Sequence, residues 1–232
     1  MTNVPEGDLK IFLPSCDSLT SQETVQLYDS CADSYEQSFH MMSYNAPQLA
    51  VDFLNAHFLP SREDALVLDV ACGSGLVAKL MSELGFKLFV GVDGSKGMLE
   101  QAGVTGLYQD LRLALLGKQP LPAQPGRFDV VIIVGALGVG FAPVSIIREL
   151  CQAAKPGGYV CMARGQHTGP AASRYQQVLE EELQRMEEEG LWRRAGVQLT
   201  DRYMKEPPSV CGKEQSHFIS GCVYLYQKTP DP

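Results

Sequence analysis

Runs of apolar residues alternate with amphipathic segments along most of this chain of 232 residues. Apolar runs of strand length occupy 65–71, 87–92, 104–109, 128–134 and 158–164. Between them, apolar residues recur every three or four positions, which predicts helices at 76–85, 95–102, 111–117 and 143–154. This alternation indicates an α/β fold with a mainly parallel sheet, right-handed crossovers and helices on both faces.

The segment before the first strand is also predicted to be helical. Thr20 and Glu23 have the spacing of a capping box, and apolar residues continue at helical spacing as far as Tyr35. A second helix is predicted from Ala46 to Phe58, because Pro60 would end it. Two helices therefore precede the first strand.

The pattern after the fifth strand predicts a long helix followed by two more strands. Apolar residues at helical spacing cover 170–189, and Gly190 is a suitable stop. We expect strands at 196–205 and 219–227, forming an antiparallel hairpin joined by the Pro207-Pro208 loop. The sheet would then have seven strands, with the last one antiparallel.

Length and composition suit one globular domain. Hydrophobic residues make up 45% of the chain and charged residues 20%, which is ordinary for such a domain. We divide the sequence into a flexible N-terminus (1–19), N-terminal helices (20–60) and one larger domain (61–232), and expect a monomer.

Charge and cysteine content exclude several classes of function. The net charge of −8 argues against an extended basic surface that would bind nucleic-acid phosphates. No stretch approaches the roughly 18 apolar residues of a membrane span, and the first residues lack the features of a signal peptide. We expect a cytoplasmic location, with the nucleus left open. The seven cysteines contain no C-x-x-C pair, so we expect reduced thiols and no metal site.

The first strand ends in a glycine turn, D-V-A-C-G-S-G at 69–75. Gly73 and Gly75 lack a Cβ, so the backbone can turn sharply there and approach a nucleotide-like ligand closely. With Ala78, the turn also satisfies the G-x-G-x-x-G/A fingerprint of NAD enzymes. The turn alone does not choose between cofactors.

Later strands also end at residues suited to a nucleotide. The second strand ends in Asp93, 18 residues after Gly75, where a carboxylate can accept both hydroxyls of a ribose. The third is expected to end in Asp110, and the fourth is followed by Gly135. Since parallel strands share one carboxyl edge, these residues should gather at one site.

Five motifs in this order resemble the class I S-adenosylmethionine-dependent methyltransferases over residues 65–165. They are D-x-A-C-G-S-G at 69–75, G-V-D-G-S at 91–95, Q-D-L at 109–111, F-D-V-V at 128–131 and K-P-G-G at 155–158. Upstream, Y-D-x-x-A-x-x-Y at 28–35 is similar to the segment preceding this domain in small-molecule methyltransferases of the ubiquinone-biosynthesis type. The resemblance implies a Rossmann-like fold, S-adenosylmethionine as cofactor and an N-terminal helical lid.

The resemblance also implies roles for individual residues. Asp93 would bind the ribose, Asp110 the adenine amino group, and the Leu111 amide a ring nitrogen of adenine. Together, the residues expected to contact the cofactor are Tyr35, Asp69, Cys72, Gly73, Gly75, Asp93, Gly94, Met98, Asp110, Leu111 and Val134.

Structural roles compete with several of these assignments. Asp93 is also a good cap for the helix starting near Ser95, and Met98 suits the core as well as an adenine wall. Cys72 suits the turn because it is small. Gly94 stands where the family often has an apolar side chain against adenine, which would leave that face looser.

No residue is assigned as the catalytic base. The chain lacks the N/D-P-P-Y motif of base amino-group methylation and the Pro-Cys nucleophile of cytosine methylation, so nucleic-acid acceptors lose support. Tyr35, His40 and Tyr44 are lid candidates or simply packing residues. Arg164 and His167 follow the fifth strand, either contacting substrate or lying in a solvated loop.

Three functional interpretations remain open. The first is a methyltransferase acting on a small molecule or a protein. The second is a cofactor-binding regulatory protein without robust catalysis. The third is an NAD-dependent oxidoreductase, which is weakened because no proton-donor motif such as Tyr-x-x-x-Lys is present.

Overall fold

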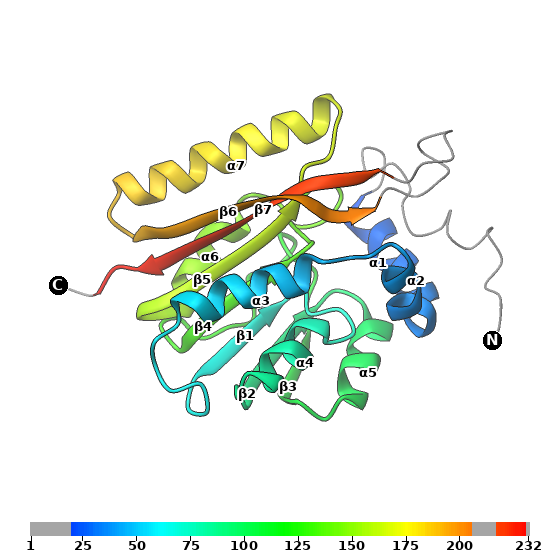
Figure 1. The fold of residues 1–232 in the computed structure, drawn as a ribbon, viewed down its shortest axis with the longest axis horizontal. Helices are drawn as coiled ribbons and strands as arrows, with labels where there is room; N and C mark the ends of the chain where they lie inside the picture. The colour runs from blue at the N-terminus through cyan, green and yellow to red at the C-terminus, as the bar shows by residue number, and fades with distance from the viewer. Residues whose placement is uncertain (1–19, 206–216, 231–232) are drawn as a thin grey trace.

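The computed structural model describes residues 20–205 and 217–230. The expectations of a flexible N-terminus at 1–19 and of a Pro207-Pro208 loop lie outside these residues. In the described part, a seven-stranded sheet has the strand order β3-β2-β1-β4-β5-β7-β6 (Figure 1). Its first five strands pair in parallel, whereas β7 is antiparallel to both β5 and β6. The predicted Rossmann-like seven-stranded sheet is confirmed.

The strands are bounded by turns and loops along the chain. They are β1 (Leu66–Val70), β2 (Leu88–Asp93), β3 (Tyr108–Leu113), β4 (Phe128–Val134), β5 (Ala154–Gly165), β6 (Trp192–Lys205) and β7 (Phe218–Lys228). The chain adds β2 and β3 on one side of β1 and then returns to add β4 and β5 on the other side. The strand order therefore reverses at β1. Open α/β sheets bind ligands at such a switch point, outside the carboxyl ends of the strands.

Helices cover both faces of the sheet. Their bounds are α1 (Ser21–Cys31), η3 (Ala32–Ser34), α2 (Tyr35–Met41), α3 (Ala46–His57), α4 (Leu76–Glu83), α5 (Lys96–Val104), α6 (Ile146–Ala153) and α7 (Pro170–Glu188). Buried residues of α3 and α4 pack on one face, and buried residues of α6 and α7 pack on the other. Side chains alternate along each strand, so Leu68 faces α6 and α7 whereas Val67 faces α3 and α4.

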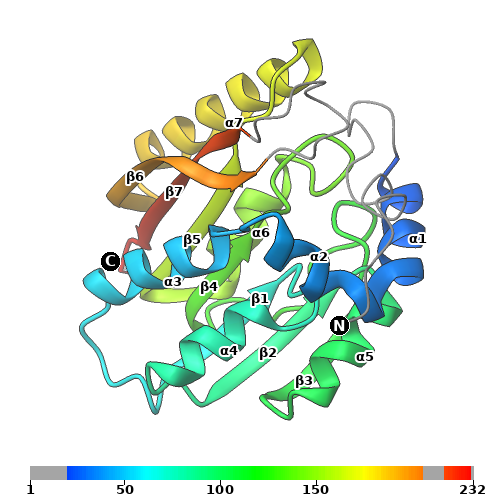
Figure 2. The same cartoon turned by 45° about the vertical axis from the view of Figure 1, so that its right-hand side comes forward.

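The N-terminal helices differ from the expected single helix. The capping box is present, since Thr20 Oγ1 accepts from the Glu23 amide and Glu23 Oε2 accepts from the Thr20 amide. The chain then passes through the short 3₁₀ turn η3 before α2 begins at Tyr35. Figure 2 shows α1 and α2 side by side, with α1 next to α5.

The third strand was predicted too early, and the helix at 111–117 is absent. Helix α5 continues to Val104, and Gly106 turns the chain at a φ of +68° before β3 begins at Tyr108. Leu111 lies within β3, paired with Gly91 of β2. The leucines that suggested a helix therefore extend an edge strand and its following loop.

Strand β6 also begins earlier than expected, at Trp192 rather than at Gly196.

No helix in the part of the chain described here combines the length and apolarity needed to cross a membrane.

Candidate active site

A large pocket opens at the carboxyl edge of the parallel strands, and its empty space of about 1320 Å³ includes open solvent at its mouth. Its floor comes from residues that follow β1, β2, β3 and β4, and α1 and α2 form the opposite wall. Of the residues predicted to contact a cofactor, those that line it are Tyr35, Gly73, Asp93, Gly94, Met98 and Val134. The sheet topology has thus brought the strand-end residues together.

The glycine turn after β1 approaches the pocket with its backbone. Ala71 and Gly73 both line the pocket, and both have a φ of +54°. For Ala71 this is a strained conformation, of the kind that gathers at binding sites. A Cβ on Gly73 would lie 4.0 Å from the hydroxyl of Tyr35, so this tyrosine lies close to the turn.

The neighbouring residues of the turn have packing roles. Gly75 has a φ of +93°, and a Cβ there would lie 3.2 Å from the ring of Tyr108, so its missing side chain makes room for protein. Cys72 lines a smaller adjoining recess, and burial raises the pKa of its thiol well above the ordinary value. The recess and the raised pKa of the thiol suit a packing role for Cys72 better than that of a reactive thiolate.

Asp93 joins the turn to the second strand. One of its oxygens accepts from the Gly73 amide and the other from the Ser95 amide, both at 2.8 Å. Burial raises the pKa of Asp93, while the bonds from Ser95 and Gly73 oppose that rise. A carboxylate has about four lone-pair sites, so each oxygen can accept a further hydrogen bond from a ligand in the pocket. The helix cap itself is Ser95, whose hydroxyl accepts from the Met98 amide.

Asp69 lies beneath the pocket and not in its lining. The alternation of β1 directs it toward the face covered by α3 and α4, where the Tyr108 hydroxyl donates to Asp69 Oδ2 at 2.7 Å. Burial raises the pKa of Asp69 to about 7. The hydrogen bond from Tyr108 thus links Asp69 to β3.

The prediction for Asp110 and Leu111 was wrong in position. Both lie within β3 and outside the pocket lining, and Asp110 is ion-paired with Arg112 at 2.6 Å with its side chain 47% exposed. Their place at the strand end is taken by Leu115 and Leu116, which follow β3 and line the pocket. Sequence reasoning missed this pair, although they are the apolar residues that follow the strand.

Val25 of α1 supplies the apolar group that Gly94 lacks. A Cβ on Gly94 would lie 3.0 Å from Val25 Cγ2 and 3.4 Å from Leu115 Cδ1. Met98 lines the same region and is only 1% exposed, so its core and pocket roles coexist. The face that was expected to be loose is therefore closed by the N-terminal helix.

An aromatic chain connects the N-terminal helices to the rest of the wall. Tyr28 packs on Phe141 with ring centroids 6.2 Å apart, and Tyr35 packs on Phe39 at 4.3 Å. Tyr44 continues the chain to Tyr203 of β6 at 5.8 Å. His40, by contrast, is exposed and outside the lining.

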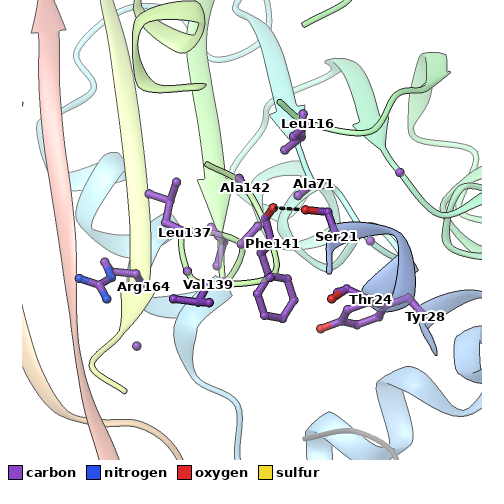
Figure 3. A pocket seen from close by; sticks show the side chains of 18 of the residues that line it. Ser21, Thr24, Tyr28, Ala71, Leu116, Leu137, Val139, Phe141, Ala142 and Arg164 are labelled. Carbon is purple, nitrogen blue, oxygen red and sulfur yellow. Dashed lines mark hydrogen bonds between the residues drawn. The ribbon is translucent and has the colours of Figure 1, made fainter. Parts of the chain in front are cut away.

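Hydrogen bonds dock the same segment at both ends. Ser21 Oγ donates to the Phe141 carbonyl across the pocket at 3.3 Å (Figure 3). The connection between α2 and α3 is tied to β6, since the Lys205 amide donates to the Met42 carbonyl and the Asn45 amide to the Tyr203 carbonyl. The N-terminal segment is thus held over the pocket.

Asp29 fixes α1 to the beginning of α5. Its Oδ1 accepts from the Ser95 hydroxyl at 2.6 Å and from the Gly97 amide at 3.0 Å. A Cβ on Gly97 would lie 3.1 Å from Ala32 Cβ and 3.2 Å from the Asp29 carbonyl oxygen, so the two elements pack closely. A carboxylate at a helix N-terminus also interacts favourably with the helix dipole.

Arg164 and His167 both line the pocket, as substrate contacts would. Arg164 is 2% exposed, and the solvated-loop interpretation does not hold for it. A loop of residues 137–142 completes this side, and sequence reasoning missed it because no periodic pattern marks it.

Among residues 20–205 and 217–230, no three His, Cys, Asp or Glu side chains gather as a metal site would require.

Comparisons with known proteins agree with this geometry. A family model described as a methyltransferase domain matches residues 68–162. Methyltransferase-like protein 27 of Homo sapiens is 46% identical over 170 residues, which cover 73% of this chain and 68% of that protein.

More distant relatives match only part of their own length. A ubiquinone biosynthesis O-methyltransferase of Albidiferax ferrireducens is 35% identical, covering 40% of this chain and 38% of that protein. An 18S rRNA (guanine-N(7))-methyltransferase of Mus musculus is 36% identical, covering 42% and 30%. A solved S-adenosylmethionine-dependent methyltransferase from Mesorhizobium loti has the same fold, with a TM-score of 0.53 and 17% identity over 76% of this chain and 96% of that one.

Proposed function

Because the chain belongs to the methyltransferase family, we propose that it transfers the methyl group of S-adenosylmethionine to a small organic acceptor. The observation that carries this proposal is the Asp93 carboxylate, held by the Gly73 and Ser95 amides at the edge of a pocket that the N-terminal helices cover. The glycine turn allows the backbone to approach a nucleoside closely, and the carboxylate at the end of β2 can accept hydrogen bonds from its ribose hydroxyls.

The pocket residues fit this cofactor. Asp93 retains lone pairs for ribose hydroxyls, and Gly73 leaves room for a ligand beside the turn. Val25, Met98 and Leu115 offer apolar walls suited to a flat ring beside Asp93. When bound, the cofactor supplies a methyl group that is already strongly electrophilic.

The chain's own contribution is to position the reactants and exclude water. The helices α1 and α2 cover the pocket, and aromatic side chains line the space between these helices and the strand ends. Alignment of an acceptor with the methyl group and removal of solvent can account for much of a methyl transfer. Asp93 is the only Asp or Glu in the described lining, and its place beside the turn suits binding better than proton removal.

A small acceptor fits the covered pocket better than a macromolecule does. The lining is dominated by apolar side chains, and the Ser21 bond to Phe141 crosses the pocket. The net charge of −8 offers little attraction to RNA. One distant relative is named for a methylation of 18S rRNA, so RNA belongs among the acceptors tested.

A transfer assay tests the proposal. The protein is incubated with S-adenosylmethionine labelled on the methyl group and with separate small-molecule, protein and RNA fractions of a cell extract. We expect label in the small-molecule fraction. Label in protein or RNA instead would contradict the small acceptor, and cofactor binding without any transfer would favour a regulatory protein.

A further inference from the structure

A buried cation lines the pocket where β5 ends. Arg164, near the end of β5, is 2% exposed, and its Nε and Nη1 have no hydrogen-bond partner among the residues described. Its guanidinium carbon lies over the ring of Tyr175, 5.6 Å from the ring centroid. The Tyr175 hydroxyl donates to the Ala142 carbonyl at 2.7 Å, which fixes the ring in place.

This arrangement leaves a charge without its usual partner. An arginine side chain stays protonated in proteins, and burying an unpaired charge is costly. Contact with an aromatic ring offsets only part of that cost. Arg164 takes part in none of the ion pairs found in the described part of the chain. A ligand that brings a negative charge would satisfy it.

The surroundings of Arg164 define the rest of that ligand. Leu137, Val139 and Phe141 also line the pocket, and Figure 3 draws them beside Arg164, whose guanidinium is directed away from them. In the described lining, Arg164 is the only Arg or Lys, with His167 as the other basic side chain. The single positive charge of Arg164 and the apolar side chains around the pocket suit a ligand that has one negative charge and is otherwise apolar.

Arg164 is also well separated from the proposed ribose site. Asp93 ends β2 and Arg164 lies near the end of β5, three steps apart in the order β2-β1-β4-β5. At a strand spacing of about 4.8 Å, this is a separation on the order of 14 Å. The two charged groups therefore face opposite ends of the pocket, one for the nucleoside and one for a second molecule.

We propose that the methyl acceptor is an organic monoanion with an apolar body, whose carboxylate pairs with the guanidinium of Arg164. This inference rests on the proposed methyltransferase function. The planar guanidinium presents its donors in a fork that matches a carboxylate. A phosphate monoester carries more than one negative charge near pH 7, whereas Arg164 supplies a single positive charge. A carboxylate therefore matches this part of the pocket better than a phosphate does.

Fractionating the acceptors by charge tests the proposal. Small molecules from a cell extract are separated by ion exchange into anionic, neutral and cationic pools before labelled S-adenosylmethionine and the protein are added. We expect transfer to the anionic pool, unchanged after phosphatase treatment and lost after the carboxylates are esterified. Transfer to the neutral or cationic pool, or loss after phosphatase treatment, would overturn the proposal.

Variants then assign the effect to Arg164. Arg164→Met should reduce transfer to the anionic pool at least tenfold, while its affinity for S-adenosylhomocysteine stays within about twofold of the unchanged protein. Arg174→Met removes the same charge from an exposed position of α7 and should leave transfer unchanged. Arg164→Met should also raise the melting temperature, because it removes a buried unpaired charge.

The possible failures are distinguishable. If Arg164→Met transfers as well as the unchanged protein, or melts at a lower temperature while losing S-adenosylhomocysteine affinity, Arg164 is structural and the inference is wrong. If the unchanged protein binds the cofactor but labels none of the pools, the proposed function fails, and this inference fails with it.

Discussion

At the scale of single residues, two buried carboxylates near the glycine turn have different surroundings. Asp93 lines the pocket and accepts from two backbone amides, whereas Asp69 lies beneath it and accepts from the Tyr108 hydroxyl. Burial raises the pKa of both groups, to about 7 for Asp69. We therefore expect Asp93 to control ligand affinity and Asp69 to control stability.

Replacing Asp93 tests its role in binding. Asp93→Asn keeps the shape of the side chain but loses the charge and one acceptor oxygen, so a ribose hydroxyl would lose a charge-assisted bond. Such a bond contributes about 1.5 to 3 kcal/mol, which corresponds to about ten- to a hundredfold in affinity. Calorimetry with S-adenosylhomocysteine measures the change. Asp110→Asn is the matched control and should bind normally, because Asp110 lies on β3 outside the lining.

Replacing Asp69 tests its effect on stability. Its folded-state pKa of about 7 lies above the ordinary Asp value of about 3.9, so the stability linked to its proton is complete below that ordinary value and is lost as the pH rises through 7. Asp69→Asn removes this titration. The unfolding free energy of the unchanged protein should fall relative to Asp69→Asn between pH 4 and pH 8, by on the order of 4 kcal/mol.

Denaturant unfolding at several pH values measures this difference. The other titratable groups facing Asp69 are Tyr108, Cys72 and Asp93, and they are common to both proteins. A difference between the two proteins that does not change with pH would mean that Asp69 does not titrate in this range.

The sequence predicted those strand-end positions that backbone topology controls. Asp93 was placed correctly because it ends a strand whose apolar run is unambiguous. Asp110 was misplaced because the leucines from 111 to 116 fit a helical spacing as well as a strand and its loop. Val25 filling the space beside Gly94 was not predictable, since that contact depends on how α1 packs on the finished core.

At the scale of elements, the N-terminal helices form the covering wall of the pocket. Asp29 attaches α1 to α5, Ser21 reaches the loop at Phe141, and the stretch after α2 is bound to β6. The bonds of Ser21 and Asp29 are partly buried or exposed, and a segment held by such bonds opens at lower free energy than the sheet does. We therefore expect this covering to open as a unit and to close over bound cofactor.

A variant of Gly97 tests the attachment of the covering helices. Gly97→Val would force its side chain against Ala32 and the Asp29 backbone, and should lower amide protection in residues 21–41 about tenfold. Gly103→Val is the control, because it lies on an exposed position of the same helix, with only Leu111 at an ordinary contact distance.

Hydrogen exchange with and without S-adenosylhomocysteine measures both variants. The ligand should increase protection of the covering helices in the unchanged protein. Equal protection with and without the ligand would mean that they are permanently packed structure, and Tyr35 would then lose its proposed role at the cofactor site.

At the scale of the whole molecule, the sequence comparisons place this chain in the methyltransferase family, although its glycine fingerprint also occurs in NAD enzymes. The mainly parallel sheet could be predicted from the alternation of strands and helices, and an N-terminal helical covering from the family resemblance. The strand order came only from the structure.

Thermal unfolding distinguishes the two cofactors. A ligand at a hundred times its dissociation constant stabilises a folded protein by about 2.7 kcal/mol. For a chain of this size each kcal/mol raises the melting temperature by about 2 to 4 °C. S-adenosylmethionine should therefore raise it by several degrees, and NAD at the same concentration should leave it unchanged. A larger shift with NAD would contradict the methyltransferase assignment.

The bonds from Met42 and Asn45 to β6 have a consequence for how the protein is made. A ribosome releases residues 20–45 long before Tyr203 and Lys205, so the first helices emerge without the strand on which they will dock. Contacts of such wide sequence separation form late. During synthesis α1 can therefore dock on α5 and on the loop at Phe141 before β6 exists, whereas the connection between α2 and α3 gains its attachment only after β6 has emerged.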